Sequence, residues 1–428
     1  MLIEAKILTN PSFEPELGWI RVEDAVITEI GHGPAPDMPG IQKIGHPNQL
    51  LVPAFIDAHA HLPQIDCIGC DGLPLLRWLE EVIFPAETWW GQGGALHTAK
   101  TAARRFAREG TVGVAGYLTS HAEMNREVVG WLAANTSMRW LVGRVAMDQE
   151  APEALTMEDL QRPRMRPGPG PVMAPFAASD RRCAISANPR FAVSCSEELL
   201  AEIAWACKER ANEPGGTPYI QTHLAESLDE IARVSELFPK DAHYTGVYDR
   251  LGLLTNKTLL AHCVHLSEEE WAIIAERDSI VVHCPTANTF LQSGTFNLDA
   301  AERHGVRIAL GSDVAGGPDL AMPRVARAMI EVAKLRRLGA DDPASVRVPS
   351  PAEAWDLITR GNAEILGWTD AGRIEVGAAA DLLLLNIPLA WHDEHLVGRL
   401  IYNWRSGLIE KRIFNGHLME RTHAGEQA

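Results

Sequence analysis

Two histidines one residue apart, His59 and His61, are the side chains in this sequence best suited to binding a metal ion. They end the apolar run at residues 50–61, which is typical of a buried strand that finishes in polar residues. Because residues i and i+2 of a strand point to the same face, both imidazoles would aim the same way. Imidazole nitrogens on rigid backbone suit zinc or iron. The pair alone is weak evidence, since chance pairs and core histidines are common, so a site needs further ligands.

Four later polar residues also end strand-like apolar runs. His223 follows residues 218–222, His262 follows 258–261, His283 follows 279–282 and Asp313 follows 306–312. The C-terminal ends of barrel strands converge on one face, so a barrel would gather these side chains with His59 and His61 around one ion. Taken singly, a histidine at a strand end is more often a satisfied polar residue, and Asp313 also suits a turn. We interpret His265, close to the helix start expected at Ser267, as structural.

The middle of the sequence alternates apolar strand-like runs with amphipathic helical stretches, which is the pattern of βα units around a parallel sheet. The helical stretches lie at residues 98–108, 197–210, 267–276 and 323–338. Short strand-like runs occupy both chain ends, at residues 3–8, 19–22, 25–30, 381–386 and 409–414. We therefore predict an α/β fold in which residues 51–371 form a metal-dependent (β/α)8 TIM-like barrel. Residues 1–50 and 372–428 are predicted to form a small composite β-sandwich domain.

Length and charge limit the possible partners of the chain. Its 428 residues suit one barrel-sized domain together with a smaller one. The formal net charge of −17 disfavours nucleic acid and anionic membranes, because such a surface repels them, whereas a neutral nucleobase is unaffected. No Gly-x-Gly-x-x-Gly follows a strand, so a dinucleotide-binding fold has no support.

Cysteine usage indicates a reducing compartment. The 7 Cys are odd in number and scattered through apolar stretches, which is typical of free thiols, and we interpret the lone Cys67-x-x-Cys70 as structural. The N-terminus lacks a signal-peptide pattern and no apolar run approaches the ~20 residues that span a bilayer, so we expect a cytoplasmic protein. The Pro-rich stretch at residues 162–175 is predicted to be a surface loop near the mouth of the active site.

Several short segments carry a resemblance to a known family. They lie at residues 59–64, 75–79, 84–87, 189–196, 223–227, 253–258, 261–262, 283–288 and 312–317. In these segments the chain resembles the amidohydrolase superfamily and, within it, the guanine deaminase family. The match extends over nearly the whole chain, from the N-terminal strands to residues 372–377.

The resemblance implies roles for individual residues. It implies His59, His61, His223 and Asp313 as metal ligands, Glu226, His262 and Asp313 as catalytic groups, and Gln64, Arg190 and Phe191 as base-binding residues. His283 would lie near the site and shape it without binding metal. The resemblance also implies a homodimer.

The number of metal ions has a check in the sequence. Binuclear members of the superfamily bridge two ions with a modified Lys on a strand. Between His61 and His223 this chain has only Lys100 and Lys208, and both lie in predicted helices. We therefore expect one Zn²⁺ per chain, with Fe²⁺ as an alternative because imidazole suits both ions.

The expected reaction is hydrolytic deamination of guanine to xanthine and ammonia by a metal-activated water. In this hypothesis Asp313 accepts the proton of the water, Glu226 protonates ring N3 and His262 stabilises the attacking oxygen. Arg190 and Gln64 would bind polar edges of the base, and Phe191 would stack on its ring. The alternatives are deamination of cytosine, 8-oxoguanine or a melamine-like aminotriazine, and, more remotely, a non-catalytic scaffold. A scaffold is disfavoured because every ligand position is filled.

Overall fold

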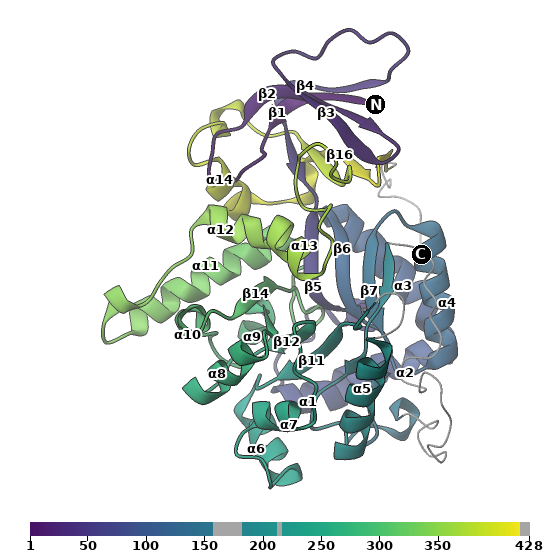
Figure 1. Ribbon diagram of the computed structural model, residues 1–428, viewed down its shortest axis with the longest axis vertical. Coiled ribbons are helices and arrows are strands. Elements are labelled where there is room, and N and C mark those ends of the chain that lie inside the picture. Colours follow the sequence, from purple (N-terminus) through teal and green to yellow (C-terminus); the bar gives the residue numbers. More distant parts are fainter. Residues whose placement is uncertain (157–181, 212–215, 420–428) are drawn as a thin grey trace.

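The computed structural model describes residues 1–156, 182–211 and 216–419 of the chain (Figure 1). The Pro-rich stretch at residues 162–175 lies outside these described residues.

Strands from both ends of the chain form one seven-stranded sheet, in the order β17-β16-β15-β4-β1-β2-β3. Its members are β1 (Leu2–Ile7), β2 (Glu16–Glu23), β3 (Val26–His32), β4 (Lys43–Pro53), β15 (Leu382–Leu385), β16 (Ile409–Phe414) and β17 (His417–Leu418). Neighbouring strands are antiparallel except β1 and β4, which are parallel. Apolar side chains of the sheet form a small core of their own, separate from the main core of the molecule. The composite β unit predicted from the chain ends is therefore present, with its described strands in one seven-stranded sheet where the sequence predicted a sandwich, and Figure 1 shows it at one end of the molecule.

Eight parallel strands of the described residues form the barrel. They are β5 (Phe55–His61), β6 (Thr111–Tyr117), β7 (Arg139–Gly143), β9 (Cys183–Ile185), β11 (Ile220–Leu224), β12 (Thr258–His262), β13 (Ile280–His283) and β14 (Arg307–Leu310). They pair in the arcs β5-β6-β7-β9 and β11-β12-β13-β14, and the short strands β8 (Val145–Ala146) and β10 (Asn188–Pro189) pair beside them. A parallel bridge between Ala187 and Ile220 joins the arcs on one side. On the other side, the amide of Asp313 donates to the carbonyl of His59 (2.8 Å).

Helices follow the barrel strands, as the alternating pattern predicts. They are α3 (Ala95–Glu109), α4 (Ala122–Asn135), α5 (Glu197–Arg210), α6 (Leu228–Leu237), α7 (Tyr244–Arg250), α8 (Glu268–Glu276), α9 (Pro285–Phe290), α10 (Leu298–Arg303), α11 (Met322–Gly339), α12 (Pro351–Asp356) and α13 (Asn362–Ile365). Ser227, Ser267 and Ser350 begin α6, α8 and α12 with capping boxes, in which a Glu three residues on bonds back to the Ser amide. The four helical stretches expected from the sequence are confirmed as α3, α5, α8 and α11.

Two further helical features were not expected. Residues 62–94, between β5 and α3, are largely helical and include α1 (Leu75–Trp78) and α2 (Phe84–Trp89). The C-terminal segment, predicted to be β, contains α14 (Leu396–Asn403), which packs against α11 and α12.

The apolar run at residues 50–61 is two strands, where the sequence predicted one. β4 ends at Pro53 in the terminal sheet and β5 begins at Phe55 in the barrel. Between them, the amide of Ala54 donates to the carbonyl of Asp381 (2.9 Å). Both strands are buried around this point, so the apolar pattern runs through the break and cannot reveal it.

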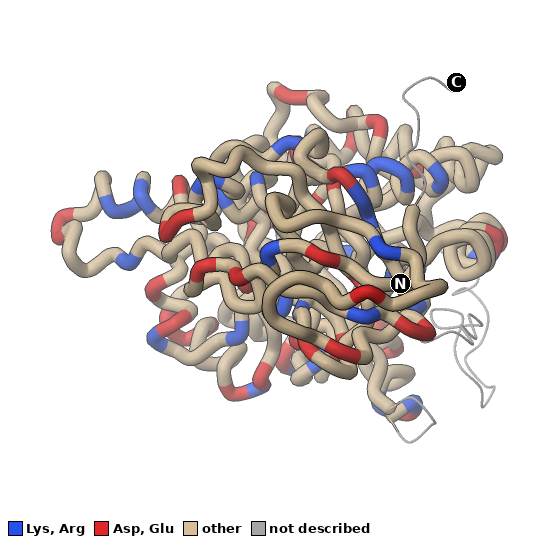
Figure 2. The backbone as a smooth tube through the Cα atoms, turned by 90° about the horizontal axis from the view of Figure 1, so that it is seen from above, with Lys and Arg blue, Asp and Glu red and all other residues tan. Residues whose placement is uncertain are grey.

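Charged residues are mixed over the described chain. Figure 2 shows Lys and Arg interspersed with Asp and Glu along the backbone, in keeping with an overall negative chain that lacks a concentrated basic tract in the described ranges. Among the helices described, none is both long enough and apolar enough to cross a membrane.

A buried ion network connects the barrel with the terminal sheet, and its loss should destabilise the protein. Asp381, before β15, accepts bonds from Arg139 Nε (3.0 Å) and Arg182 NH2 (2.8 Å), and the Asp381 side chain is 1% exposed. We expect Asp381→Asn to lower the free energy of unfolding by about 3–5 kcal/mol, because two guanidinium groups lose a buried carboxylate. Urea unfolding measures the change. Asp370→Asn is the control: Asp370 binds the same Arg139 but is 53% exposed, so about 1 kcal/mol or less is expected. An equal effect of the two changes would contradict the prediction.

Candidate active site

Four histidines and one aspartate meet at the C-terminal end of the barrel. His59 and His61 end β5, His223 lies in β11, His262 ends β12, and Asp313 follows β14 after a short loop. His61 Nε2 lies 3.2 Å from His223 Nε2 and 3.4 Å from Asp313 Oδ1. His59 Nε2 lies 3.2 Å from Asp313 Oδ1, and His262 Nε2 lies 3.7 Å from Asp313 Oδ2. Of the six strand-end candidates from the sequence, the structure therefore brings together His59, His61, His223, His262 and Asp313, and leaves only His283 outside the group.

The donor set of this cluster fits a metal ion. His59, His223, His262 and Asp313 each offer one ligand atom, and these atoms all lie within 4.8 Å of one another. The Nε2 atoms of His59 and His262 are buried without a hydrogen-bond partner, which leaves them available for a ligand. His223 Nδ1 lies 2.6 Å from the carbonyl oxygen of Arg190, so this nitrogen carries the proton and Nε2 presents its lone pair to the cluster.

Protonation states agree with that donor set. Burial, together with the neighbouring imidazoles His59 and His61, holds the pKa of His223 well below its usual range. Burial also lowers the pKa of His61 to about 4. Burial pushes the pKa of Asp313 upward, but the rings of His59 and His61 outweigh it and hold that pKa well below its usual range. Neutral imidazoles facing an ionised carboxylate are the forms that bind a divalent cation.

Glu226 lies beside the cluster and is held by its surroundings. Its Oε2 lies 3.3 Å from His262 Nε2, and its Oε1 accepts a hydrogen bond from Ser293 Oγ (2.9 Å). Its backbone amide donates to Oε2 of Glu230 (2.8 Å), which is the glutamate of the α6 capping box. Burial, and second the charge of Asp313, raise the pKa of Glu226 to about 8. A carboxyl group with this pKa is a proton donor near neutral pH.

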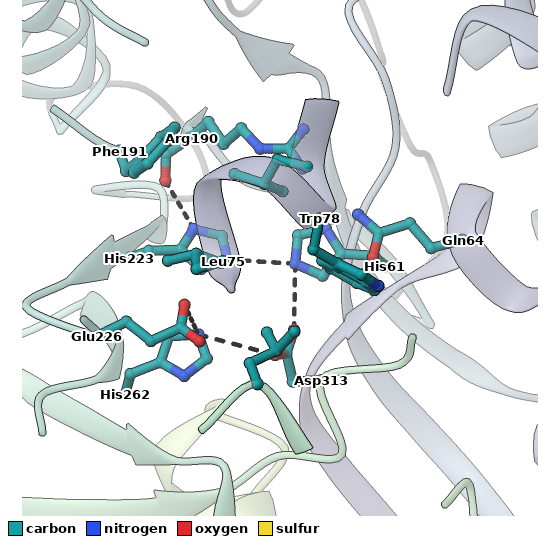
Figure 3. A pocket seen from close by; sticks show the side chains of 12 residues that line it. His61, Gln64, Leu75, Trp78, Arg190, Phe191, His223, Glu226, His262 and Asp313 are labelled. Carbon is teal, nitrogen blue, oxygen red and sulfur yellow. Dashed lines mark hydrogen bonds and ion pairs between the residues drawn. The ribbon is translucent and has the colours of Figure 1, made fainter. Parts of the chain in front are cut away.

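A cavity opens beside these groups (Figure 3). Its polar end is lined by His61, His223, Glu226, His262 and Asp313, and its other walls by Gln64, Leu75, Trp78, Leu79, Arg190, Phe191 and Leu291. Leu75, Trp78 and Leu79 come from the helical segment after β5, so this segment completes the cavity. All three base-binding candidates from the sequence line the same cavity as the catalytic candidates.

Comparison with known proteins decides the family. The amidohydrolase family matches residues 50–419. The chain belongs to this family. Guanine deaminase from Mus musculus is 31% identical over 366 residues, covering 81% of this chain and 74% of the relative. Guanine deaminase from Escherichia coli K12 is 31% identical over 341 residues, covering 79% of this chain and 73% of the relative. The structure of guanine deaminase from C. acetobutylicum with bound guanine superposes with a TM-score of 0.85 at 26% identity, over 98% of this chain and 99% of that one.

Family membership makes the chain a metal-dependent hydrolase with a mixed α/β barrel fold. The two Lys residues between His61 and His223 lie in helices, as the sequence predicts. Lys100 lies in α3 and Lys208 in α5, both outside the strand ends that form the cluster.

His283 stays outside the amidohydrolase cluster. It is buried at the end of β13, its ring stacks on Phe296 with centroids 4.4 Å apart, and it is absent from the residues that line the cavity. His265, interpreted as structural, has its Nε2 2.7 Å from the carbonyl oxygen of Ser293. Cys67 and Cys70 are free thiols, one buried and one exposed.

Several residues that hold the site in place could not be recognised as site residues from the sequence. Asn288 Oδ1 lies 2.8 Å from His262 Nδ1, and Ser293 bonds to Glu226. Asp57 accepts bonds from the amides of Ser312 (2.9 Å) and His59 (3.1 Å), which ties β5 to the loop that carries Asp313. Of Asn288, Ser293 and Asp57, only Asp57 has a local signal, since it is a charged residue inside the apolar run before His59.

Glu87 was also missed as a site residue. It accepts bonds from both Gln64 and Arg190 and is fully buried. Its signal in the sequence was a carboxylate three residues after Phe84 within a largely apolar segment.

Proposed function

We propose that this amidohydrolase converts guanine and water to xanthine and ammonia. The observation that carries the proposal is a single cavity: Gln64, Arg190 and Phe191 line the wall of the same space whose end is formed by the metal-type cluster and Glu226. The relatives and the guanine-bound structure described above support guanine as the base.

We assign one metal ion to His59, His61, His223 and Asp313. His262 is an alternative fourth ligand by distance, but its Nε2 also faces Glu226, and its Nδ1 is held by Asn288. This orientation suits contact with a reacting water better than ligation. When bound, Zn²⁺ supplies a Lewis acid and lowers the pKa of a water toward ~7, and Fe²⁺ is the alternative ion.

The side chains then divide the proton transfers of the reaction. Asp313 accepts a proton from the attacking water, and His262 orients the oxygen of that water toward C2 of guanine. Glu226 delivers a proton to ring N3, so that C2 can become tetrahedral. The proton taken up by Asp313 then passes to the exocyclic amine, which departs as ammonia, while the hydroxyl at C2 returns a proton to Glu226 and becomes the carbonyl of xanthine.

The base would be held by the opposite wall of the cavity. Arg190 donates to an oxygen acceptor of the base, and Gln64 can both donate and accept at an amide-like edge. Phe191, which is 5% exposed, offers a ring face for stacking. A homodimer remains a prediction from the resemblance, and a cytoplasmic location remains one from the cysteine usage.

Ammonia release from a panel of bases tests the proposal. With purified metal-loaded protein, we expect kcat/KM for guanine to exceed that for cytosine, adenine, 8-oxoguanine and melamine by about 100-fold or more. The reason is that a site built to bond a polar edge discriminates strongly against bases that leave its groups unpaired. If the protein released no ammonia from guanine but did release it from another base, guanine would be the wrong substrate and the assignment as a deaminase would stand. If metal-containing protein released ammonia from none of these bases, the proposal that it is a nucleobase deaminase would be wrong.

A further inference from the structure

A buried carboxylate behind the cavity wall joins the two polar base-binding candidates. Glu87 Oε1 accepts a hydrogen bond from Gln64 Nε2 (2.9 Å), and Glu87 Oε2 accepts one from Arg190 NH1 (2.6 Å). Glu87 is 0% exposed, Gln64 2% and Arg190 3%. The carboxylate does not line the cavity itself. It therefore acts on a ligand only through Gln64 and Arg190.

One face of α2 fixes the guanidinium of Arg190. Phe84 and Glu87 are three residues apart in this helix, so their side chains lie on the same face. The Cζ of Arg190 lies 5.4 Å from the centroid of the Phe84 ring, while its NH1 bonds to Glu87. A guanidinium held at one nitrogen and over one ring keeps its remaining donors in a fixed direction.

The same carboxylate fixes which way round the Gln64 amide lies. A carboxylate only accepts, so it requires the NH2 group of Gln64 on its side. At the other end, Gln64 Oε1 accepts from the backbone amide of Ala315 (3.3 Å). The amide is thus held by both ends, and it keeps one N–H and one oxygen lone pair for a ligand in the cavity.

Glu87 also cancels the charge of the cavity wall. Arg190 and Glu87 form a buried ion pair with zero net charge. The wall consequently offers hydrogen-bond donors without a net positive charge. Such a wall suits a neutral polar base, whereas an unpaired buried guanidinium would attract an anion and carry a large desolvation cost.

We propose that Glu87 is a positioning residue that determines specificity, because it orients Gln64 and Arg190 toward the edge of a neutral oxopurine and disfavours anionic purines. This inference rests on the proposed function. It concerns selection of the base and leaves the proton transfers at Glu226 and the metal cluster unchanged.

Glu87→Gln tests the inference with almost no change in side-chain size. The new amide can accept from only one partner, and its NH2 group faces a donor. We expect the KM for guanine to rise about tenfold or more while kcat changes by less than about threefold, since lost ground-state orientation weakens binding first. Discrimination against urate, an anionic oxopurine, should weaken. Its measure is the ratio of the inhibition constant of urate to the KM of guanine, and this ratio should fall about tenfold or more. Glu87→Asp, which keeps the charge, should recover much of the urate discrimination.

Glu270→Gln is the matched control. Glu270 is another buried carboxylate, 5% exposed, but it caps α8 and bonds to Thr245 and Ser267, away from the cavity. This variant should lower the melting temperature and leave KM and the urate ratio unchanged.

The outcomes separate this inference from the proposed function. An unchanged KM and urate ratio in Glu87→Gln, or the same change in Glu270→Gln, would overturn the role of Glu87. Failure of the wild-type protein on guanine would instead overturn the substrate. The same ratios would then be measured with the base that the wild type does turn over.

Discussion

Glu226→Gln should keep the metal and lose turnover, with kcat lowered by about three orders of magnitude or more. Glutamine has nearly the shape of glutamate, and its amide oxygen can still accept from Ser293 Oγ, as Glu226 Oε1 does. It cannot deliver a proton, however, and proton delivery to the ring is the step that the proposal assigns to Glu226. Because the residue is not among the assigned metal ligands, metal content should remain about one ion per chain. Steady-state ammonia release and elemental analysis of the same preparation check both parts.

The Glu270→Gln variant tests whether neutralising any buried carboxylate would lower turnover by disturbing the fold. Both changes neutralise a buried carboxylate, 3% exposed at Glu226 and 5% at Glu270. Glu270→Gln should retain kcat within a few fold, because its carboxylate holds the start of α8 and Thr245, away from the cavity. A near-normal kcat in Glu226→Gln would remove this residue from the mechanism. Loss of metal along with turnover would show instead that Glu226 supports the cluster.

The cluster could be predicted from the sequence because its geometry follows from two repeating rules. Side chains two apart on a strand share a face, which pairs His59 with His61. Parallel strands of a barrel place their C-terminal ends together, which brings His223 and His262 to the same place. Both rules need only the apolar runs and the polar residue that ends each run. The barrel and its four expected helices follow from the same alternation.

The supporting residues could not be predicted because each depends on a contact between distant segments. Glu87 meets Arg190 from 103 positions away, and Asn288 meets His262 from 26. These residues lie on helices and loops outside the barrel strands, where no periodic rule fixes which side chains meet. The strand break at Ala54 was hidden for a related reason, since burial in two different sheets gives one continuous apolar pattern.

His223→Asn should abolish metal binding and lower turnover by about 10⁴-fold, which corresponds to roughly 5.5 kcal/mol of transition-state stabilisation. The change is chosen for its geometry. His223 Nδ1 lies 2.6 Å from the carbonyl oxygen of Arg190. The NH2 group of an asparagine can occupy the position of this nitrogen and keep the hydrogen bond. The Nε2 atom that faces His61 at 3.2 Å is lost. The variant therefore removes one ligand while the backbone contact that holds the strand is retained. Elemental analysis after dialysis and ammonia release measure the two effects.

The same substitution at His283 is the matched control. His283 ends β13 as His223 lies near the end of β11, and both are strand-end histidines of the barrel. His283 instead stacks on Phe296, and it is outside the group of ligand atoms. His283→Asn should consequently lower thermal stability through lost packing and still bind about one ion per chain. If His283→Asn lost its metal while His223→Asn retained it, the ligand set proposed here would be wrong. If both lost it, the metal content would report on the fold of the barrel rather than on ligation, and the assignment of His223 would lose its support.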